Sequence, residues 1–237
     1  MDAIGSVADA TVLDVGCGTG ATTVVLASRG AREVHGIDLS VPMIDAARAH
    51  NVRADVCFVA GDVLNLDRIG DFDVVFSRFG VMFFTDPTTA FAHIRSLGAP
   101  HARLGFCCWG PPADNPWMAL PVMSTVPILG PPHLAGPGKP GPFSLSSPDA
   151  IRETLGGAGW ADVQVDELTI DQPHPAGDAD AVASVVVEFS PPIVEGLLRQ
   201  PERAGEARSA IADALRPLER DDVVHLQASA LIVTARA

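Results

Sequence analysis

The stretch Val12-Leu13-Asp14-Val15-Gly16-Cys17-Gly18-Thr19-Gly20 decides the fold of this chain. It begins as a short apolar strand and ends in glycines at every second position. Glycines after a strand let the backbone turn sharply and approach a bound ligand closely. Thr19 to Ser28 then predict a helix that is closed by Gly30. The free N–H groups and the positive dipole end at the start of this helix suit an anion, such as the carboxylate of an amino acid.

Strand and helix signals alternate along the first part of the chain. Further strands are predicted at Glu33–Ile37, Val56–Ala60, Phe72–Ser77 and Leu104–Trp109, with helices at Ser40–His50 and from Pro87 onward. In the helix after Pro87, apolar residues recur at helical spacing. This alternation is typical of a parallel sheet with helices on both faces.

The later part of the chain changes in texture. Residues 110–148 are dense in proline and glycine, and we expect a lid-like insertion there. A helix at Pro148–Gly156, a strand at Val163–Ile170, a helical insertion over residues 171–222 and a last strand at Val224–Ala235 follow. Within the insertion, Ala179–Gln200 is predicted to be helical with a break at Pro191-Pro192. The predicted fold class is α/β, a doubly wound, mostly parallel seven-stranded sheet with an antiparallel last strand, in a single domain over residues 1–237.

Composition limits the classes of partner. The net charge is −13, and an acidic surface repels phosphate backbones and anionic lipid headgroups. We therefore expect a small-molecule substrate, no nucleic acid and no membrane. The four cysteines form no CxxC pair and have no histidine at zinc-ligand spacing, which predicts no metal site and free thiols in a reducing cytoplasm.

The glycine-rich turn is open to two cofactor classes. Gly16, Gly18 and Ala21 satisfy the dinucleotide pattern GxGxxG/A, and Asp38 follows about 20 residues later, where it could bind ribose hydroxyls. Asp14 opposes a dinucleotide, because a buried carboxylate would repel a pyrophosphate. Beside the amino group and sulfonium of S-adenosylmethionine, the same charge is favourable.

With these residues the sequence resembles the class I S-adenosylmethionine-dependent methyltransferases, and most resembles their bacterial small-molecule, quinone-biosynthesis-like branch. The resemblance is clear from Thr11 to Trp117. Its four motifs are DVGCGTG (Asp14–Gly20), GIDLS (Gly36–Ser40), AGDV (Ala60–Val63) and FDVVFSRFGVMFF (Phe72–Phe84). Each lies at the predicted carboxyl end of a strand, where ligands bind in sheets of this kind.

The resemblance implies S-adenosyl-L-methionine as the cofactor, with Asp38 on both ribose hydroxyls and Leu39 against the adenine. It also places the Asp62 carboxylate on the adenine amino group and offers the backbone N–H of Val63. The implied cofactor-binding residues are Asp14, Gly16, Cys17, Gly18, Thr19, Gly20, Asp38, Leu39, Met43, Gly61, Asp62, Val63, Ser77, Arg78 and Phe79. Asp38 and Asp62 have an alternative interpretation as a helix cap and a turn residue.

The acceptor side is less defined. Phe79, Met82 and Phe83 belong to an apolar cluster that is open to core packing or to ligand contact, with Phe79 nearest the strand end. In the family, residues after the fifth strand often line the acceptor pocket, which adds Trp109, Asn115 and Trp117.

Methyl transfer from a sulfonium needs little covalent help, because the leaving group is good and orientation supplies most of the acceleration. Of the seven histidines, only His133 and His174 lie where they could reach a substrate. Neither is assigned, so the catalytic residue is left open.

Three hypotheses follow. The first is a small-molecule methyltransferase, the second a non-catalytic module that binds S-adenosylmethionine or S-adenosylhomocysteine, and the third an NAD-dependent oxidoreductase. The second is motivated by the short segment before the first strand, where relatives carry helices that cover the cofactor, and by the lack of an assignable base. A homodimer is also allowed, since the helical insertion could cover a partner's cleft.

Overall fold

The computed structural model describes residues 2–51, 53–66, 71–132 and 139–237. The chain divides into two compact units. The sheet unit comprises residues 1–109, 138–167 and 231–237, and the helical unit comprises residues 110–137 and 168–230. We had predicted one domain with two insertions, and those insertions supply most of the helical unit.

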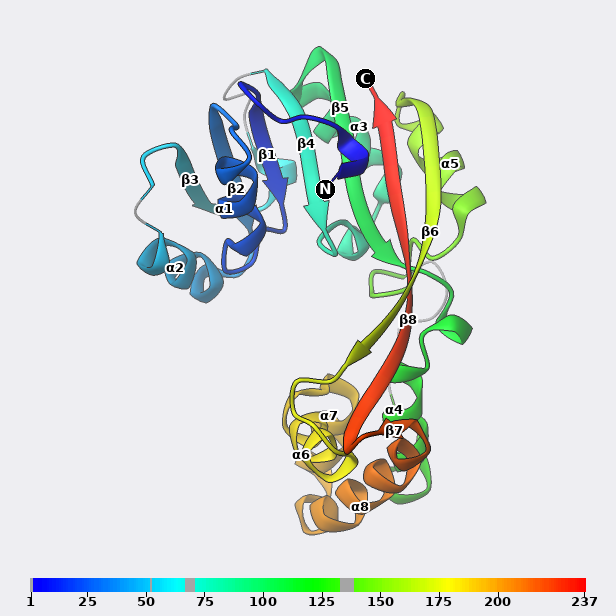
Figure 1. The fold of residues 1–237 in the computed structure, drawn as a ribbon. Coiled ribbons are helices and arrows are strands. Elements are labelled where there is room, and N and C mark those ends of the chain that lie inside the picture. Colours follow the sequence, from blue (N-terminus) through cyan, green and yellow to red (C-terminus); the bar gives the residue numbers. More distant parts are fainter. Residues whose placement is uncertain (1, 52, 67–70, 133–138) are drawn as a thin grey trace. The chain divides into compact units, whose positions relative to one another are not determined.

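The sheet has the strand order β3-β2-β1-β4-β5-β8-β6, and a short β7 pairs with β8. The strands are β1 (Thr11–Val15), β2 (Glu33–Asp38), β3 (Val56–Ala60), β4 (Phe72–Arg78), β5 (Gly98–Trp109), β6 (Ala161–Pro173), β7 (Glu219–Arg220) and β8 (Val223–Arg236). The pairs from β3 to β5 are parallel, whereas β8 runs against β5 (Figure 1). The predicted mostly parallel sheet with an antiparallel last strand is confirmed, and β7 is an addition to it.

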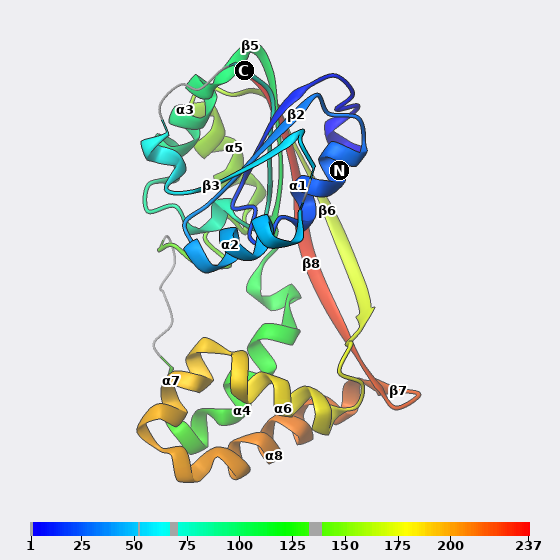
Figure 2. The same ribbon diagram turned by 90° about the vertical axis from the view of Figure 1, so that its left-hand side faces the viewer.

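Helices cover both faces of the sheet, as predicted. On one face, α1 (Ala21–Ser28) buries Leu26 and Ala27 against apolar residues of β1, β2 and β4, and α2 (Val41–His50) packs on Phe58 of β3. On the other face, α3 (Pro87–Leu97) and α5 (Pro148–Gly157) pack on each other and on the sheet (Figure 2).

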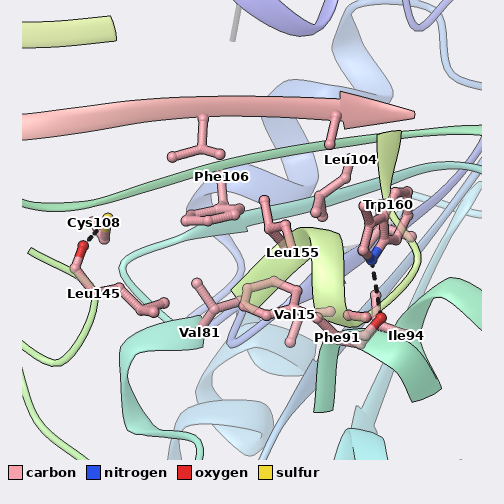
Figure 3. Packing of buried hydrophobic residues seen from close by; sticks show 14 of the residues in the cluster. Val15, Val81, Phe91, Ile94, Leu104, Phe106, Cys108, Leu145, Leu155 and Trp160 are labelled. Atoms are coloured by element: carbon pink, nitrogen blue, oxygen red, sulfur yellow. Dashed lines mark hydrogen bonds between the residues drawn. The ribbon is translucent and has the colours of Figure 1, made fainter. Parts of the chain in front are cut away.

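The core under α3 and α5 is apolar and closely packed. Phe91, Leu155 and Leu104 are almost fully buried in it (Figure 3). Buried polar groups in this core find partners: the indole N–H of Trp160 donates to the Phe91 carbonyl at 3.0 Å. The Cys108 thiol likewise lies 3.2 Å from the Leu145 carbonyl. This core holds the strands in place from the side opposite α1.

Strand β5 starts earlier than we predicted. It begins at Gly98 and not at Leu104, because Gly98 pairs with Phe72 of β4 before a register shift in which five residues of β5 face two of β4. Pairing between residues that are distant in the sequence therefore extends the predicted strand toward its start.

The helical unit gathers four helices around their own core. These are α4 (Pro116–Leu129), α6 (Ala179–Phe189), α7 (Pro191–Arg199) and α8 (Ala204–Leu215). The break at Pro191-Pro192 is confirmed, since α6 and α7 are bent by 73°. Across the described ranges, no single helix is long and apolar enough to span a membrane; α6 and α7 pass that test only as a bent pair, by length and composition.

The irregular character that we predicted for the whole of residues 110–148 is wrong for part of it. Residues 116–129 form α4 although Pro121 and Pro127 lie inside the helix. Val122 and Leu129 are buried in the core of the helical unit. Tertiary packing on α7 and α8 therefore overrides the weak helix propensity of this segment.

The turns after β1 and β4 approach so closely that only glycine fits between them. A Cβ on Gly80 would lie 2.6 Å from the Val15 carbonyl oxygen and 2.8 Å from the Gly16 Cα. Gly80 itself has a φ of −90°, which alanine adopts without strain. The requirement for glycine at this position is therefore steric.

We predict that Gly80→Ala lowers the free energy of unfolding by about 1–3 kcal/mol, because backbone must shift to admit the methyl group. Gly61→Ala is the matched control, since a Cβ there has no neighbour within 4 Å. Chemical denaturation of both variants checks the prediction. Equal stability of the two variants would contradict the close approach of the turns.

Candidate functional site

Three carboxylates lie at the carboxyl ends of three adjacent strands. Asp14 is the fourth residue of β1, Asp38 is the last residue of β2, and Asp62 follows β3 by two residues. Because these strands are parallel neighbours, their carboxyl ends meet at one edge of the sheet. This edge is where open α/β sheets bind their ligands.

The glycine turn after β1 is held by β2. Gly16, Gly18 and Gly20 have φ angles of +68°, +56° and +84°, which lie in the left-handed region that favours glycine. The backbone N–H groups of Gly16 and Cys17 both donate to the Ile37 carbonyl. The turn is therefore fixed before any ligand binds.

Asp38 links this turn to the start of α2. Its Oδ2 accepts from the Gly18 N–H and its Oδ1 accepts from the Ser40 N–H, both at 2.8 Å. Asp38 therefore holds the N-cap residue Ser40, whereas the first turn of α2 has no side-chain cap. Each carboxylate oxygen still has a second lone pair, so a half-buried Asp38 retains the capacity to accept from ribose hydroxyls.

Asp14 is fully buried on the α1 side of β1. Its Oδ2 accepts from the Thr23 hydroxyl of α1 at 2.7 Å, and its Oδ1 has no hydrogen-bond partner within the described residues. Burial raises the pKa of Asp14 to about 7, against the lowering effects of the Thr23 hydroxyl and the Arg78 charge. An orphaned buried carboxylate oxygen is costly, and it fits a site whose cationic ligand compensates that cost.

The remaining residues of the turn differ in exposure. Cys17 is buried, and burial raises the pKa of its thiol to about 12, so the thiol is no nucleophile at neutral pH. Thr19 is exposed at the tip of the turn.

The side of the site formed by β2 and β3 combines polar and apolar groups. Asp62 accepts from the Leu64 N–H at 2.9 Å and caps the short helix Val63–Asn65, and Gly61 donates to the Asp38 carbonyl. Val63 is buried in the core. Leu39 and Met43 are 72% and 47% exposed, an unusual position for large apolar side chains and one that suits a planar ring resting on them.

At the end of β4, Ser77 is buried, and its hydroxyl donates to the Val15 carbonyl at 2.7 Å and accepts from the Gly80 N–H. Arg78 is exposed. Phe79 adopts a φ of +61°, a strained conformation for an aromatic residue, and its ring stacks on Trp109 with centroids 4.1 Å apart.

Comparison with known proteins assigns this arrangement to a family. A family described as a methyltransferase domain matches residues 12–101, which contain all four strand-end motifs. A demethylmenaquinone methyltransferase of Mycolicibacterium gilvum is 31% identical over 171 residues, which are 67% of this chain and 71% of that enzyme. The chain belongs to the class I S-adenosylmethionine-dependent methyltransferases.

Other similarities are more local or concern the fold alone. A magnesium-protoporphyrin O-methyltransferase of Rhodobacter capsulatus is 39% identical over 79 residues, so the match spans 32% of this chain and about a third (34%) of that relative's length. The structure of an S-adenosylmethionine-dependent methyltransferase from Mesorhizobium loti has a TM-score of 0.55 at 17% identity and covers 98% of this chain and 93% of its own.

Met82 and Phe83, both predicted for the acceptor side, differ in their exposure. Met82 is 1% exposed and lies in the core, which places it in the packing alternative and removes it from the candidate contacts. The short helix Val81–Phe83 instead turns Phe83 outward, where it is 55% exposed. Phe79, Phe83 and Trp109 therefore stay as candidates in the sheet unit.

Asn115 and Trp117 belong to the helical unit, and Asn115 is fully buried there. Its amide nitrogen donates to the carbonyls of Gly110, Pro111 and Ser229. Its Oδ1 accepts from the Ser229 N–H and from the Trp117 indole. Because its amide hydrogen-bonds to the chain itself, these contacts favour a structural role for Asn115, and its assignment to the acceptor stays a prediction.

Among the histidines that the structure describes, we assign none as a general base. His133 lies outside the described residues. His174 lies in the helical unit, where its backbone N–H donates to Val224 and its Nδ1 accepts from the Ala176 N–H. The described residues also contain no group of three or more His, Cys, Asp or Glu side chains that could hold a metal ion.

We predict that Asp14 makes the unfolding free energy fall with rising pH. Its pKa is about 7 in the folded chain and near 3.8 in the unfolded chain, so the folded state binds the extra proton between these values. The contribution of the neutral carboxyl to the unfolding free energy is therefore lost as the pH rises from about 4 to about 7. Asp14→Asn stays neutral, and we expect it to be more stable than the wild type at about pH 8 but not at about pH 4.

Denaturant titrations of both proteins at several pH values measure this difference. Thr23→Val removes the hydrogen bond that lowers the pKa of Asp14, so the unfolding free energy should continue to fall up to a higher pH. Thr23→Ser keeps this hydrogen bond and should leave the dependence of stability on pH unchanged. An Asp14→Asn protein that is less stable than the wild type at about pH 8 would refute the explanation.

A second prediction concerns Asn115. Asn115→Ala removes the hydrogen bonds that the side chain makes to the Gly110 carbonyl and to the Ser229 N–H, and should cost on the order of 2 kcal/mol of stability. The control is Asp114→Ala at the exposed neighbouring position. If thermal unfolding were unchanged in Asn115→Ala and only acceptor affinity fell, Asn115 would be an acceptor contact after all.

Proposed function

We propose that this chain transfers the methyl group of S-adenosylmethionine to a small-molecule acceptor. The observation that carries the proposal is the buried Asp14 carboxylate with its unpartnered Oδ1, beside a glycine turn that is already fixed. A cation is the ligand that such a carboxylate favours. Family membership supports the same conclusion.

The charge at the strand ends separates this proposal from the dinucleotide alternative. Asp14, Asp38 and Asp62 bring three carboxylates to the carboxyl ends of adjacent strands. A pyrophosphate needs positive potential at the turn, whereas a cofactor with a sulfonium and an ammonium gains from negative potential. The NAD hypothesis therefore loses its support.

Each residue has a distinct task in holding the cofactor. Asp38 accepts from the ribose hydroxyls, Asp14 provides negative charge for the ammonium and sulfonium, and Asp62 accepts from the adenine amino group. The exposed Leu39 and Met43 provide an apolar surface for the adenine ring. When bound, S-adenosylmethionine supplies an electrophilic methyl group on a good leaving group.

The chain's contribution to the rate is positioning. The glycine turn and Asp38 are tied together by hydrogen bonds, so the cofactor site needs no reorganisation when it is used. An acceptor held in line with the methyl group then reacts faster because orientation is already achieved. Phe79, strained and stacked on Trp109, is the residue best placed to orient a planar acceptor in the sheet unit.

A small acceptor, no nucleic acid and no membrane partner are part of the proposal, supported by the net charge of −13. We also propose the cytoplasm as the location, supported by the four free cysteines. The homodimer stays a prediction.

Isothermal titration with S-adenosylmethionine, S-adenosylhomocysteine and NAD in parallel tests the cofactor assignment. We expect binding of both sulfur ligands, weakened at least about tenfold in Asp38→Asn because charge-assisted hydrogen bonds to the ribose are lost. The control is Asp55→Asn, a partly exposed carboxylate that pairs with Arg53 away from the strand ends. Binding of NAD alone would refute the proposal.

Turnover distinguishes an enzyme from a non-catalytic binding module. We expect slow conversion of S-adenosylmethionine to S-adenosylhomocysteine that some acceptor in a panel of planar metabolites stimulates. A chain that binds both sulfur ligands but shows no stimulated turnover would favour the module.

A further inference from the structure

An exposed guanidinium lies on the same face of the sheet as the buried Asp14. Val12 of β1 and Phe76 of β4 both pack under α1, and side chains two residues apart along a strand share a face. Asp14 lies two residues after Val12 on β1, and Arg78 lies two residues after Phe76 on β4, so both side chains are on the face under α1. Asp14 is paired in register with Phe76, so Arg78 stands two residues beyond it on the neighbouring strand.

Arg78 has no ion pair or side-chain hydrogen bond within the part of the chain that the structure describes. Elsewhere in this acidic protein, arginines pair with carboxylates, as in Arg29–Asp2 and Arg53–Asp55. Burial raises the pKa of Asp14, and the charge of Arg78 opposes that rise, so the two charges are near each other. They form no ion pair or hydrogen bond with each other, so the charge of each is available to a ligand that carries both charges.

A third feature on this face favours an anion. Helix α1 begins after Gly20, which provides no side-chain cap, and its first turn contains no acidic residue. The first N–H groups of a helix have no intrahelical acceptor, and the dipole adds positive potential there. The helix end and Arg78 thus offer positive charge close to the negative charge of Asp14.

We propose that Arg78 binds the α-carboxylate of the cofactor's amino-acid part, and that the negative charge of the buried Asp14 attracts its α-ammonium. This inference rests on the proposed function. An α-amino acid carries its two charges on one carbon, and the site offers a cation and an anion on neighbouring strands. A guanidinium also binds a carboxylate through two parallel hydrogen bonds, which a lysine cannot form.

The proposal makes Arg78 a specificity residue for intact S-adenosylmethionine. Decarboxylated S-adenosylmethionine keeps the adenosine, the sulfonium and the ammonium but lacks the group that Arg78 binds. We expect the wild type to prefer S-adenosylmethionine over the decarboxylated form, and we expect that preference to depend on Arg78.

The experiment measures Kd for S-adenosylmethionine and for decarboxylated S-adenosylmethionine by titration calorimetry in four proteins. These are the wild type, Arg78→Gln, Arg78→Lys and Arg208→Gln. Arg208 is an exposed arginine of the helical unit, so its substitution makes the same change in net charge away from the site. The readout is the ratio of the two Kd values, which is independent of any acceptor.

In Arg78→Gln we expect the preference for S-adenosylmethionine to fall about tenfold or more, with decarboxylated S-adenosylmethionine bound no more weakly than before. The ratio of the two Kd values in Arg78→Lys should lie between those of the wild type and Arg78→Gln, and the ratio in Arg208→Gln should match that of the wild type. An unchanged ratio in Arg78→Gln would overturn the proposal and leave Arg78 to the acceptor. A wild type that binds neither compound would refute the proposed function itself, and this inference with it.

Discussion

The backbones of two turns touch at Gly16 and Gly80, and the site is arranged around that contact. No side chain separates the ends of β1 and β4, and the Ser77 hydroxyl ties them by donating to the Val15 carbonyl. Asp14 comes just before the contact on one strand, and Arg78 just before it on the other. The glycine turn then continues along the end of β2, where Ile37 and Asp38 hold its N–H groups. A ligand at this edge meets groups from three strands whose spacing is fixed by backbone contact and by the side chains of Ser77 and Asp38.

The same edge concentrates features that cost stability. Asp14 is a buried carboxylate with an orphaned oxygen, and Phe79 holds a left-handed backbone conformation. Such features persist only where the surroundings determine them strongly. The apolar core under α3 and α5 supplies that support from the other face of the sheet, with large side chains such as Phe91 and Leu155 almost fully buried. Phe79 and Trp109 pack against this core, so it supports part of the candidate site directly.

Features that depend on residues close together in the sequence could be predicted, whereas features that depend on distant residues could not. The apolar strands, the glycine turn and the break at Pro191-Pro192 are local patterns, and they predicted the sheet and its ligand edge. The helix at Pro116–Leu129 was missed because prolines suggested an irregular segment, whereas burial of Val122 and Leu129 decides its structure. The hydrogen bonds of Asn115 were missed because its partner Ser229 is 114 residues away in the sequence. Met82 and Phe83 could not be told apart, since a single helical turn decides which side chain enters the core.

The pKa of about 7 at Asp14 ties occupancy of the site to the proton concentration. With a pKa near neutrality, the carboxyl of the empty chain is shared between protonated and ionised forms, and on the proposed function a cationic cofactor would select the ionised one. Binding would therefore release a proton, and acidification would compete with the cofactor for the same carboxylate. A cell that becomes acidic would withdraw the methyl donor from this protein without changing the donor's concentration.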